Sequence, residues 1–309
     1  MTFTVVNQIG PDAEAAVRSA HPDVEVVTLA GDPPPGLRAD ALFAGWGDWA
    51  EIVRWADATG APWVQLPGTG VDSVPSALYA GRVVTCARGA SAVPIAEFVL
   101  GALLAHAKRF PQTWLHEPPK RWNFARLDVL DGATLGLVGL GGIGLAVAAR
   151  ALPFGMRVVA LRRTNAPSPL ADVEVVTHLD EVLAVADHLV LAAPATARTR
   201  HLLDDVAFAR VKPGVHVVNV ARGSLVDQDA LRRALDDGRV SLATLDTVEP
   251  EPLPAGHWLY AHPNVRVSAH VSWYTPEMFR QVIDLFVENL GRRRAGLPLH
   301  GVVDPDEGY

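Results

Sequence analysis

The chain has 309 residues, of which 49% are hydrophobic and 20% charged, so it can bury a core large enough for two domains. The formal net charge of −7, without a long run of Lys and Arg, gives no electrostatic basis for binding nucleic acid or an anionic membrane. No signal peptide or membrane-spanning segment is evident, so we expect a cytoplasmic protein. The single cysteine, Cys86, excludes an intrachain disulfide and a cysteine-rich metal site, and its apolar surroundings predict a buried thiol.

The first hundred residues alternate short β-rich runs with helical stretches, a pattern typical of a small α/β unit. An apolar stretch with helical spacing follows at 94–110, where Pro94 suits a first turn and Lys108 and Arg109 lie near the end that favours cations. The expected strands of this first part are 3–6, 24–29, 41–44, 63–66 and 82–85, and its helices include 11–20 and 48–58.

A second series of strands begins at Thr134, and its runs are nearly continuously apolar rather than alternating. Strands covered by helices on both faces have this pattern, so we expect a doubly wound parallel sheet. The six runs are 134–140, 157–163, 188–194, 216–222, 242–248 and 265–270. A helix from Pro276 should follow, with one apolar stripe that needs a surface to cover: Phe279, Val282, Ile283, Phe286, Val287 and Leu290.

The segment from Gly139 to Gly144, Gly-Leu-Gly-Gly-Ile-Gly, lies between an apolar strand and a helical run. Gly139 permits a tight turn, Gly141 lets the backbone approach a pyrophosphate, and Gly144 lets helix and strand pack closely. The helix N-terminus would present free N–H groups to the anion. A tight turn between packed elements is the alternative interpretation, but the flanking strand and helix favour a dinucleotide site.

The end of the next strand indicates which cofactor is bound. An NAD site usually has Asp or Glu there to bind the ribose hydroxyls, whereas this chain has Arg162, Arg163 and Thr164. A guanidinium at this position pairs with a 2′-phosphate, so these residues favour NADP, with NAD as the second possibility. A solvated basic turn is the alternative.

Six ordered segments, taken together, resemble the D-isomer-specific 2-hydroxyacid dehydrogenase family, which includes glyoxylate, hydroxypyruvate and phosphoglycerate dehydrogenases. They are 66–74 (LPGTGVDSV), 90–109, 132–144, 201–231, 245–253 and 267–270 (VSAH). The resemblance implies two Rossmann-like domains, with a doubly wound nucleotide domain (101–275) inserted into a smaller flavodoxin-like substrate domain (1–100 and the helix of 276–309). It also implies an active site in the cleft between domains and a homodimer formed through the nucleotide domain.

The resemblance assigns the catalytic roles. Arg222 matches the family's substrate arginine, whose guanidinium binds the carboxylate and polarises the ketone. His270 matches the acid/base that protonates the new alkoxide during reduction. Glu251 matches the carboxylate that orients the histidine and favours its protonated form, with Glu249 as the competing choice. A salt bridge for Arg222 and a structural role for His270 are the alternatives if each is considered alone.

Gly70 and Val71, in the LPGTGVD loop, match backbone N–H groups that hold the substrate carboxylate, although a simple glycine turn explains that loop equally well. The resemblance extends the cofactor-binding set to Gly142, Ile143, Pro194, Ala221 and Asp246. The sequence has no cluster of His, Cys and Asp at the spacing of metal ligands, so we expect no metal site.

Two departures from the family pattern stand out. Phe98 replaces a histidine that is common in the family, so the role of that histidine is either absent or supplied by another residue, with His106 as a candidate; its loss need not affect the chemistry. Bulky Trp46 and Trp273 stand in the expected pocket region, where they would narrow it toward small substrates or else serve as domain-interface aromatics.

The sequence therefore predicts an oxidoreductase that transfers a hydride between NAD(P)H and a small 2-oxo acid, with glyoxylate or hydroxypyruvate favoured. The choice of acid and the physiological direction stay open at this point. The alternatives are a nucleotide-sensing binding protein of the same fold, and a family dehydrogenase acting on phosphoglycerate, formate or phosphite.

Overall fold

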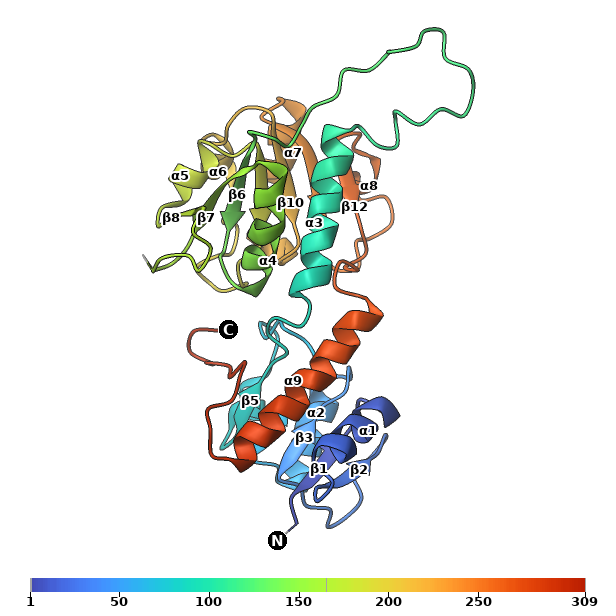
Figure 1. Cartoon of the computed structure of the whole chain (residues 1–309), viewed down its shortest axis with the longest axis vertical. Coiled ribbons are helices and arrows are strands. Elements are labelled where there is room, and N and C mark those ends of the chain that lie inside the picture. Colours follow the sequence, from blue (N-terminus) through green and yellow to red (C-terminus); the bar gives the residue numbers. More distant parts are fainter. Residues whose placement is uncertain (1, 165, 309) are drawn as a thin grey trace. The chain divides into compact units, whose positions relative to one another are not determined.

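The computed structural model describes residues 2–164 and 166–308. They form two compact units, one made of residues 1–91 with 275–309 and the other of residues 92–274, so the second is inserted into the sequence of the first. Each unit has a parallel sheet with helices packed against it, which confirms the predicted α/β class (Figure 1).

The first unit contains a five-stranded sheet in the order β2-β1-β3-β4-β5, which is the flavodoxin-like order. Its strands lie within a residue or two of the predicted runs: β1 Thr4–Asn7, β2 Glu25–Thr28, β3 Ala41–Phe43, β4 Trp63–Gln65 and β5 Val83–Thr85. The helices that accompany them are α1 Pro11–Ala20, α2 Trp49–Thr59 and the 3₁₀ turn η1 Ser76–Tyr79. Asp48 caps α2 by accepting a hydrogen bond from the Ala50 N–H.

The C-terminal helix α9, Pro276–Arg294, belongs to this first unit. Its Phe286 is fully buried, and the ring stacks on Phe43 at 4.1 Å and on Trp63 at 5.2 Å between centroids. The predicted apolar stripe therefore covers the sheet of the first unit. Cys86 in the same unit is buried, as predicted, and burial raises the pKa of its thiol.

The second unit contains a seven-stranded sheet in the order β12-β11-β10-β9-β6-β7-β8. Its strands are β6 Thr134–Val138, β7 Arg157–Leu161, β8 Val173–Val176, β9 His188–Leu191, β10 Val215–Asn219, β11 Val240–Leu245 and β12 Val265–Val267. The sequence analysis missed β8, a short edge strand whose Glu174 is exposed, because its pattern is not the continuous apolar run of a central strand. Strand order reverses between β6 and β9, the place where such sheets bind ligands.

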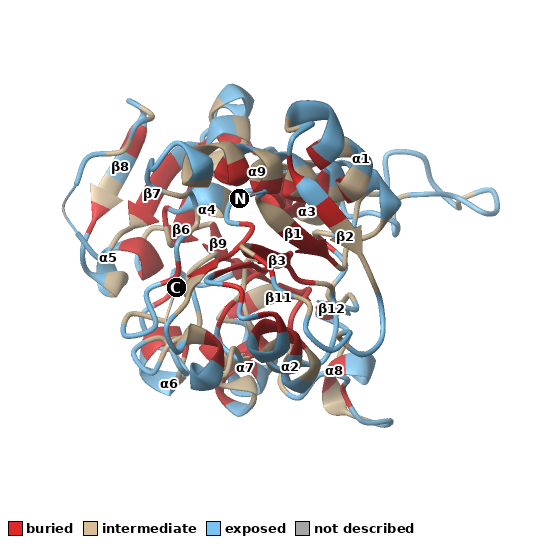
Figure 2. Ribbon diagram, turned by 90° about the horizontal axis from the view of Figure 1, so that it is seen from below, coloured by how far each residue is buried: buried red, intermediate tan, exposed pale blue. Residues whose placement is uncertain are grey.

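The helices of the second unit pack against both faces of its sheet, and buried residues concentrate on the strands and the inward helix faces (Figure 2). They are α3 Ala92–Ala107, α4 Gly142–Ala151, α5 Leu179–Leu183, α6 Asp205–Phe208, α7 Gln228–Asp236 and α8 Trp258–Ala261, with 3₁₀ turns η2 Leu152–Phe154 and η3 Gly223–Leu225. The unit begins at Ala92 rather than at residue 101, because α3 packs along its length against α4 and β10.

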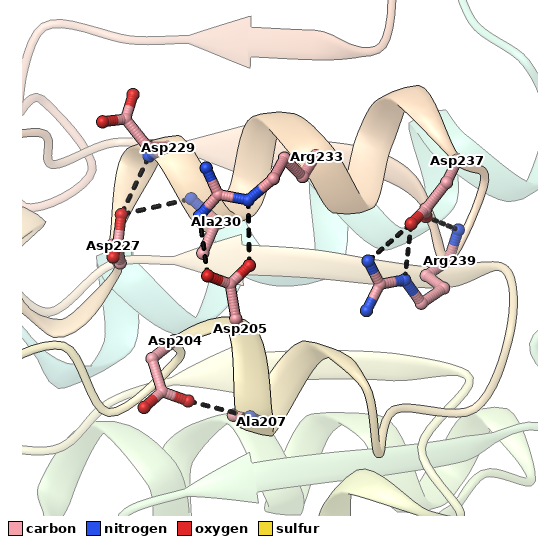
Figure 3. A network of polar contacts seen from close by, with 9 residues as sticks. All are labelled: Asp204, Asp205, Ala207, Asp227, Asp229, Ala230, Arg233, Asp237 and Arg239. Atoms are coloured by element: carbon pink, nitrogen blue, oxygen red, sulfur yellow. Dashed lines mark hydrogen bonds and ion pairs between the residues drawn. The ribbon is translucent and has the colours of Figure 1, made fainter.

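Acidic side chains fix the starts of α6 and α7, the helices that follow the strands β9 and β10. Asp204 accepts from the Ala207 N–H at the start of α6, and Asp227 accepts from the N–H groups of Asp229 and Ala230 (Figure 3). The Arg233 guanidinium of α7 pairs with Asp205 of α6 at 2.7 Å (Figure 3). These contacts fix the first turns of the two helices and join α7 to α6.

Three histidines gather at the opposite, amino-terminal edge of this sheet. Nδ1 of His188, the first residue of β9, lies 3.2 Å from Nδ1 of His216 in β10, whose Nε2 lies 2.9 Å from Thr244 Oγ1. The ring of His106, in the last turn of α3, lies 4.5 Å from that of His216. Burial lowers the pKa of all three, that of His188 to about 4, so the cluster is uncharged at neutral pH.

The cluster should make stability depend on pH. His188 binds fewer protons when folded than in the unfolded chain, where its pKa is near 6.5, so the free energy of unfolding should fall as the pH drops from 6.5 toward 4. The loss at His188 is on the order of 3 kcal/mol. Urea denaturation across this range measures it. His188→Leu should be less stable at pH 8, because His216 loses a partner, but should have a shallower slope; an equal slope would contradict the role of the cluster.

Candidate functional site

The predicted nucleotide and catalytic residues of the second unit follow the carboxyl ends of parallel strands, which meet at one edge of its sheet. The glycine segment follows β6 and the basic residues follow β7, while Pro194 follows β9 and Ala221 and Arg222 follow β10. Asp246 and Glu251 follow β11, and His270 follows β12. The structure thus brings these residues to the edge that contains the switch between β6 and β9.

The glycine segment has the close packing and the open space that a dinucleotide needs. Gly139 has φ +106°, and a Cβ there would lie 2.8 Å from the Ala192 carbonyl oxygen. A Cβ on Gly144 would lie 2.2 Å from the Gly139 oxygen, whereas one on Gly141 would meet nothing within 4 Å. The N-terminus of α4, with Gly142 and Ile143 in its first turn, lies directly beyond. These residues fit a pyrophosphate held by backbone N–H groups.

The end of β7 carries only the predicted basic and polar side chains. The Arg162 guanidinium donates to the carbonyl oxygens of Ala166 and Pro167 at 3.2 and 3.1 Å, which holds it in the loop after the strand. Arg163 and Thr164 are exposed. Residues 161–164 include no Asp or Glu, so an adenosine ribose near this strand end would meet cations rather than a carboxylate.

The histidine and the glutamate that the sequence analysis paired are in contact. Nδ1 of His270 lies 2.9 Å from Oε2 of Glu251, and the other carboxylate oxygen accepts from the Val248 N–H at 3.0 Å. The competing residue Glu249 instead pairs with Arg200 at 3.1 Å. Since Nδ1 is bonded to Glu251, Nε2 is the nitrogen that can exchange a proton with a substrate.

Asp246 anchors the loop that carries the histidine. It is 1% exposed, and its carboxylate accepts from Ser268 Oγ at 2.6 Å and from the N–H groups of Val271 and Ser272 at 2.9 and 3.0 Å. The His270 N–H donates to the Asp246 carbonyl oxygen, and His270 has φ 53°, in the left-handed region. Such backbone strain persists only where the surroundings fix it, and the four hydrogen bonds to Asp246 do so here.

Arg222 follows β10 in an extended conformation, with φ −145° and ψ 146°. The next residue, Gly223, packs so closely on the loop after β11 that a Cβ there would lie 2.0 Å from the Val248 carbonyl carbon. The turn that leads from β10 into Arg222 is closed by the side chain of Asn219, a residue that the sequence analysis did not single out. An Asn at the end of a strand, two residues before a turn, is the signal that could have identified it.

The predicted carboxylate loop belongs to the first unit. Gly68 accepts from the Ala87 N–H at 2.9 Å, and Thr69 Oγ1 donates to the Ala87 carbonyl oxygen at 3.0 Å. Within the described residues the N–H groups of Gly70 and Val71 form no hydrogen bond, and Val71 is buried. These two adjacent N–H groups therefore have no acceptor within the described residues, as in a loop that binds an anion through its backbone.

The two tryptophans lie in different units. Trp46, which is 51% exposed, contacts the ring of Phe279 of α9 edge-on at 6.1 Å between centroids. A Cβ on Gly68 would lie 3.8 Å from the Trp46 ring, so this tryptophan borders the carboxylate loop. Trp273 packs against the core of the second unit beside Tyr274.

His106 was the candidate to replace the histidine that Phe98 displaces, and that expectation is wrong. His106 lies with His188 and His216 at the amino-terminal edge of the sheet, whereas His270 follows the carboxyl end of β12. Phe98 itself packs against the core of the second unit.

Over residues 2–164 and 166–308, no three His, Cys, Asp or Glu side chains are arranged to hold a metal ion. No helix within the same ranges has the length and apolar composition needed to cross a bilayer.

Residues 100–272 match the family model described as D-isomer specific 2-hydroxyacid dehydrogenase, NAD binding domain. A D-3-phosphoglycerate dehydrogenase of Methanocaldococcus jannaschii is 33% identical over 244 residues, which are 77% of this chain and 46% of that protein. A hydroxypyruvate reductase of Thermotoga maritima is 35% identical over 231 residues, 72% of this chain and 74% of that protein. The chain spans about half the length of the phosphoglycerate dehydrogenases it matches.

A solved structure gives the same similarity over the whole chain. The crystal structure of a D-isomer specific 2-hydroxyacid dehydrogenase from Xanthobacter autotrophicus Py2, in complex with NADPH and MES, is 30% identical with a TM-score of 0.87. The comparison covers 100% of both chains.

Proposed function

The chain belongs to the D-isomer specific 2-hydroxyacid dehydrogenase family, and we propose that it reduces a small 2-oxo acid to the D-2-hydroxy acid with a nicotinamide cofactor. The observation that carries the proposal is the contact of His270 with Glu251, at the same sheet edge as Arg222 and the glycine segment. Relatives named as hydroxypyruvate and glyoxylate reductases favour hydroxypyruvate or glyoxylate as the acid.

In this mechanism Arg222 binds the substrate carboxylate and polarises the ketone. Its positive charge stabilises the negative charge that develops on the ketone oxygen in the transition state. His270 donates a proton from Nε2 to that oxygen, while Glu251 holds the ring through Nδ1 and stabilises the imidazolium. The N–H groups of Gly70 and Val71 bind the carboxylate as further donors. In oxidation His270 takes the hydroxyl proton instead.

The cofactor supplies the hydride when it is bound. Gly139, Gly141 and Gly144, with the first turn of α4 at Gly142 and Ile143, would hold its pyrophosphate. Pro194 and Ala221 would border it at the ends of β9 and β10, and Asp246 would do so while it anchors the histidine loop.

We favour NADP as the cofactor on the basis of Arg162, Arg163 and Thr164. The guanidinium of Arg162 already lies in the loop after β7, and Arg163 and Thr164 are exposed beside it, so a 2′-phosphate there would be paired. The related structure from Xanthobacter autotrophicus Py2 holds NADPH, which agrees with this choice.

Trp46 and Trp273 are proposed to limit the size of the substrate. Trp46 borders the carboxylate loop and contacts Phe279, so a large aromatic surface lies beside the two N–H groups proposed to bind the substrate carboxylate. A small acid such as glyoxylate has no side chain that would meet this aromatic surface. A phosphorylated acid would need a cation to bind its phosphate where Trp46 presents a ring.

The arm at residues 108–129 supports a homodimer as the working form. It runs as a long loop from α3 toward β6 (Figure 1), and its residues Trp114 and Trp122 are 60% and 74% exposed. Five Lys and Arg against two acidic residues give the arm a charge of +3, which leaves −10 on the rest of a chain of total charge −7. A second copy has the opposite net charge outside its own arm, and burying the two tryptophans against it would remove their apolar surface from water.

Light scattering tests the dimer. The mass in solution should be twice the 33.0 kDa of one chain, and replacing Trp114 and Trp122 together by Ser should lower it toward 33.0 kDa. A wild-type protein that is monomeric at micromolar concentration would exclude this role of the arm.

The reaction is tested by the loss of NADPH, and separately of NADH, on addition of glyoxylate, hydroxypyruvate, pyruvate and a branched 2-oxo acid. We expect turnover with the small acids and little with the branched one. His270→Ala should reduce kcat by about 10²- to 10⁴-fold while NADPH binding is kept. No turnover with any acid, in protein that still binds NADPH, would favour a nucleotide-sensing role. Equal turnover of glyoxylate and the branched acid would remove the size-limiting role of the tryptophans.

Cofactor choice is tested by Arg162→Asp, which places a carboxylate where the adenosine ribose would lie. We expect the ratio of kcat/KM for NADPH to that for NADH to fall by at least about tenfold, because a charge-assisted contact to the 2′-phosphate is lost. Arg157→Asp, at the start of the same strand and therefore at its far end, is the matched control and should leave the ratio unchanged. An unchanged ratio in Arg162→Asp would place the 2′-phosphate elsewhere.

A further inference from the structure

The side chain of Asn219 closes the turn that leads into Arg222. Asn219 is the last residue of β10 and is 1% exposed. Its Oδ1 accepts from the Ala221 N–H at 3.0 Å, and its Nδ2 donates to the Arg222 carbonyl oxygen at 2.9 Å. The amide thus bonds the backbone two and three residues ahead through its acceptor and its donor, away from solvent.

Arg222 is held from both sides by these contacts and by the packing of the next residue. Asn219 fixes the backbone up to the Arg222 carbonyl, and Gly223 lies against Val248, where even a Cβ would be 2.0 Å from the carbonyl carbon. The extended backbone of Arg222 between these two points determines the direction of its Cα–Cβ bond. The Arg222 side chain, with its guanidinium, therefore leaves the backbone in a fixed direction.

The same residue connects the arginine turn to the histidine loop. The Asp246 N–H donates to the Asn219 carbonyl oxygen at 2.9 Å, and the His270 N–H donates to the Asp246 carbonyl oxygen at 2.9 Å. These bonds use only the backbone of Asn219, so they remain when its side chain is removed, and the effect of that change is confined to the turn that leads into Arg222. Position is critical here, because an error of about 1 Å in a reacting group can cost on the order of 100-fold in rate.

We propose that Asn219 is a positioning residue for Arg222: its buried amide sets the turn that aims the guanidinium at the substrate carboxylate, without touching the substrate itself. The inference rests on the proposed function, since it specifies what holds the arginine of that site.

The chain provides a matched control in Asn7, which ends β1 of the other unit. Asn7 is also 1% exposed, its Oδ1 accepts from the Ile9 N–H at 3.0 Å, and its Nδ2 donates to the Gly10 carbonyl oxygen at 2.8 Å. The two bonds within the turn have the same spacing at Asn7 and Asn219, and Asn7 Nδ2 also donates to Thr28 Oγ1 at 2.9 Å. Only the turn of Asn219 carries an arginine of the site.

The experiment compares Asn219→Ala with Asn7→Ala in the full-length protein. Both should lower the thermal midpoint by a few degrees, because Asn219→Ala removes two side-chain hydrogen bonds and Asn7→Ala removes three. At a temperature where all variants are folded, Asn219→Ala should raise KM for the best 2-oxo acid and lower kcat/KM by about 10- to 100-fold, with the Kd for NADPH within about twofold of wild type. Asn7→Ala should keep wild-type kcat and KM.

A double-mutant cycle with Arg222→Ala distinguishes positioning from general damage. In the Arg222→Ala background, Asn219→Ala should change kcat/KM by less than about twofold, because the group that it positions is gone. Asn219→Asp should behave like the alanine variant, since it keeps the acceptor for Ala221 but sets a carboxylate oxygen against the Arg222 carbonyl.

Two results would overturn the inference: kinetics of Asn219→Ala equal to those of Asn7→Ala, or full additivity with Arg222→Ala. A wild-type protein inactive toward every 2-oxo acid would instead refute the proposed function. In that case the crystal structure of Asn219→Ala decides the inference alone, because an Arg222 Cβ displaced by about 1 Å relative to wild type supports it and an unmoved one overturns it.

Discussion

The candidate site depends on a buried carboxylate that accepts hydrogen bonds from two backbone N–H groups and one hydroxyl. Asp246 is removed from solvent at the end of β11, and its oxygens accept from Ser268, Val271 and Ser272. A charge buried in this way is costly unless it is fully hydrogen-bonded, so the loop after β12 has one favourable arrangement around it. That arrangement places His270 in the left-handed region and brings its ring to Glu251. The parallel sheet contributes by bringing the ends of β11 and β12 side by side.

The same principle extends along the sheet edge. At the end of β10 the neutral amide of Asn219 forms the hydrogen bonds that close the turn before Arg222. At the end of β6 no side chain has this role, and the chain is fixed by close backbone packing at Gly139 and Gly144. Each strand end thus has its own means of fixing the chain where regular pairing stops. Rigid strand ends allow a loop to present a polar group without losing its position, which is what a site for hydride and proton transfer requires.

The sequence was sufficient for the α/β class, the two parallel sheets and the central strands, because continuous apolar runs and capping residues are local signals. It also pointed to Glu251 over Glu249, a choice that agrees with the contact at His270. It missed β8, an edge strand with an exposed Glu174, and it missed Asn219, since the bonds of that side chain appear only once the turn is folded. His106 was misplaced because sequence spacing does not tell which edge of a sheet a helix end will reach.

Asn7 and Asn219 show that the same local turn occurs at the ends of two strands in this chain, with a different role at each. Both amides end a parallel strand, bridge the N–H two residues ahead and the carbonyl three residues ahead, and are equally buried. At Asn7 the turn leads into α1, and the third residue is Gly10, which has no side chain to direct. At Asn219 the third residue is an arginine, followed by a glycine that permits contact with the next loop. The turn is thus a general solution for leaving a strand, and the residue at its third position determines whether it becomes part of a site.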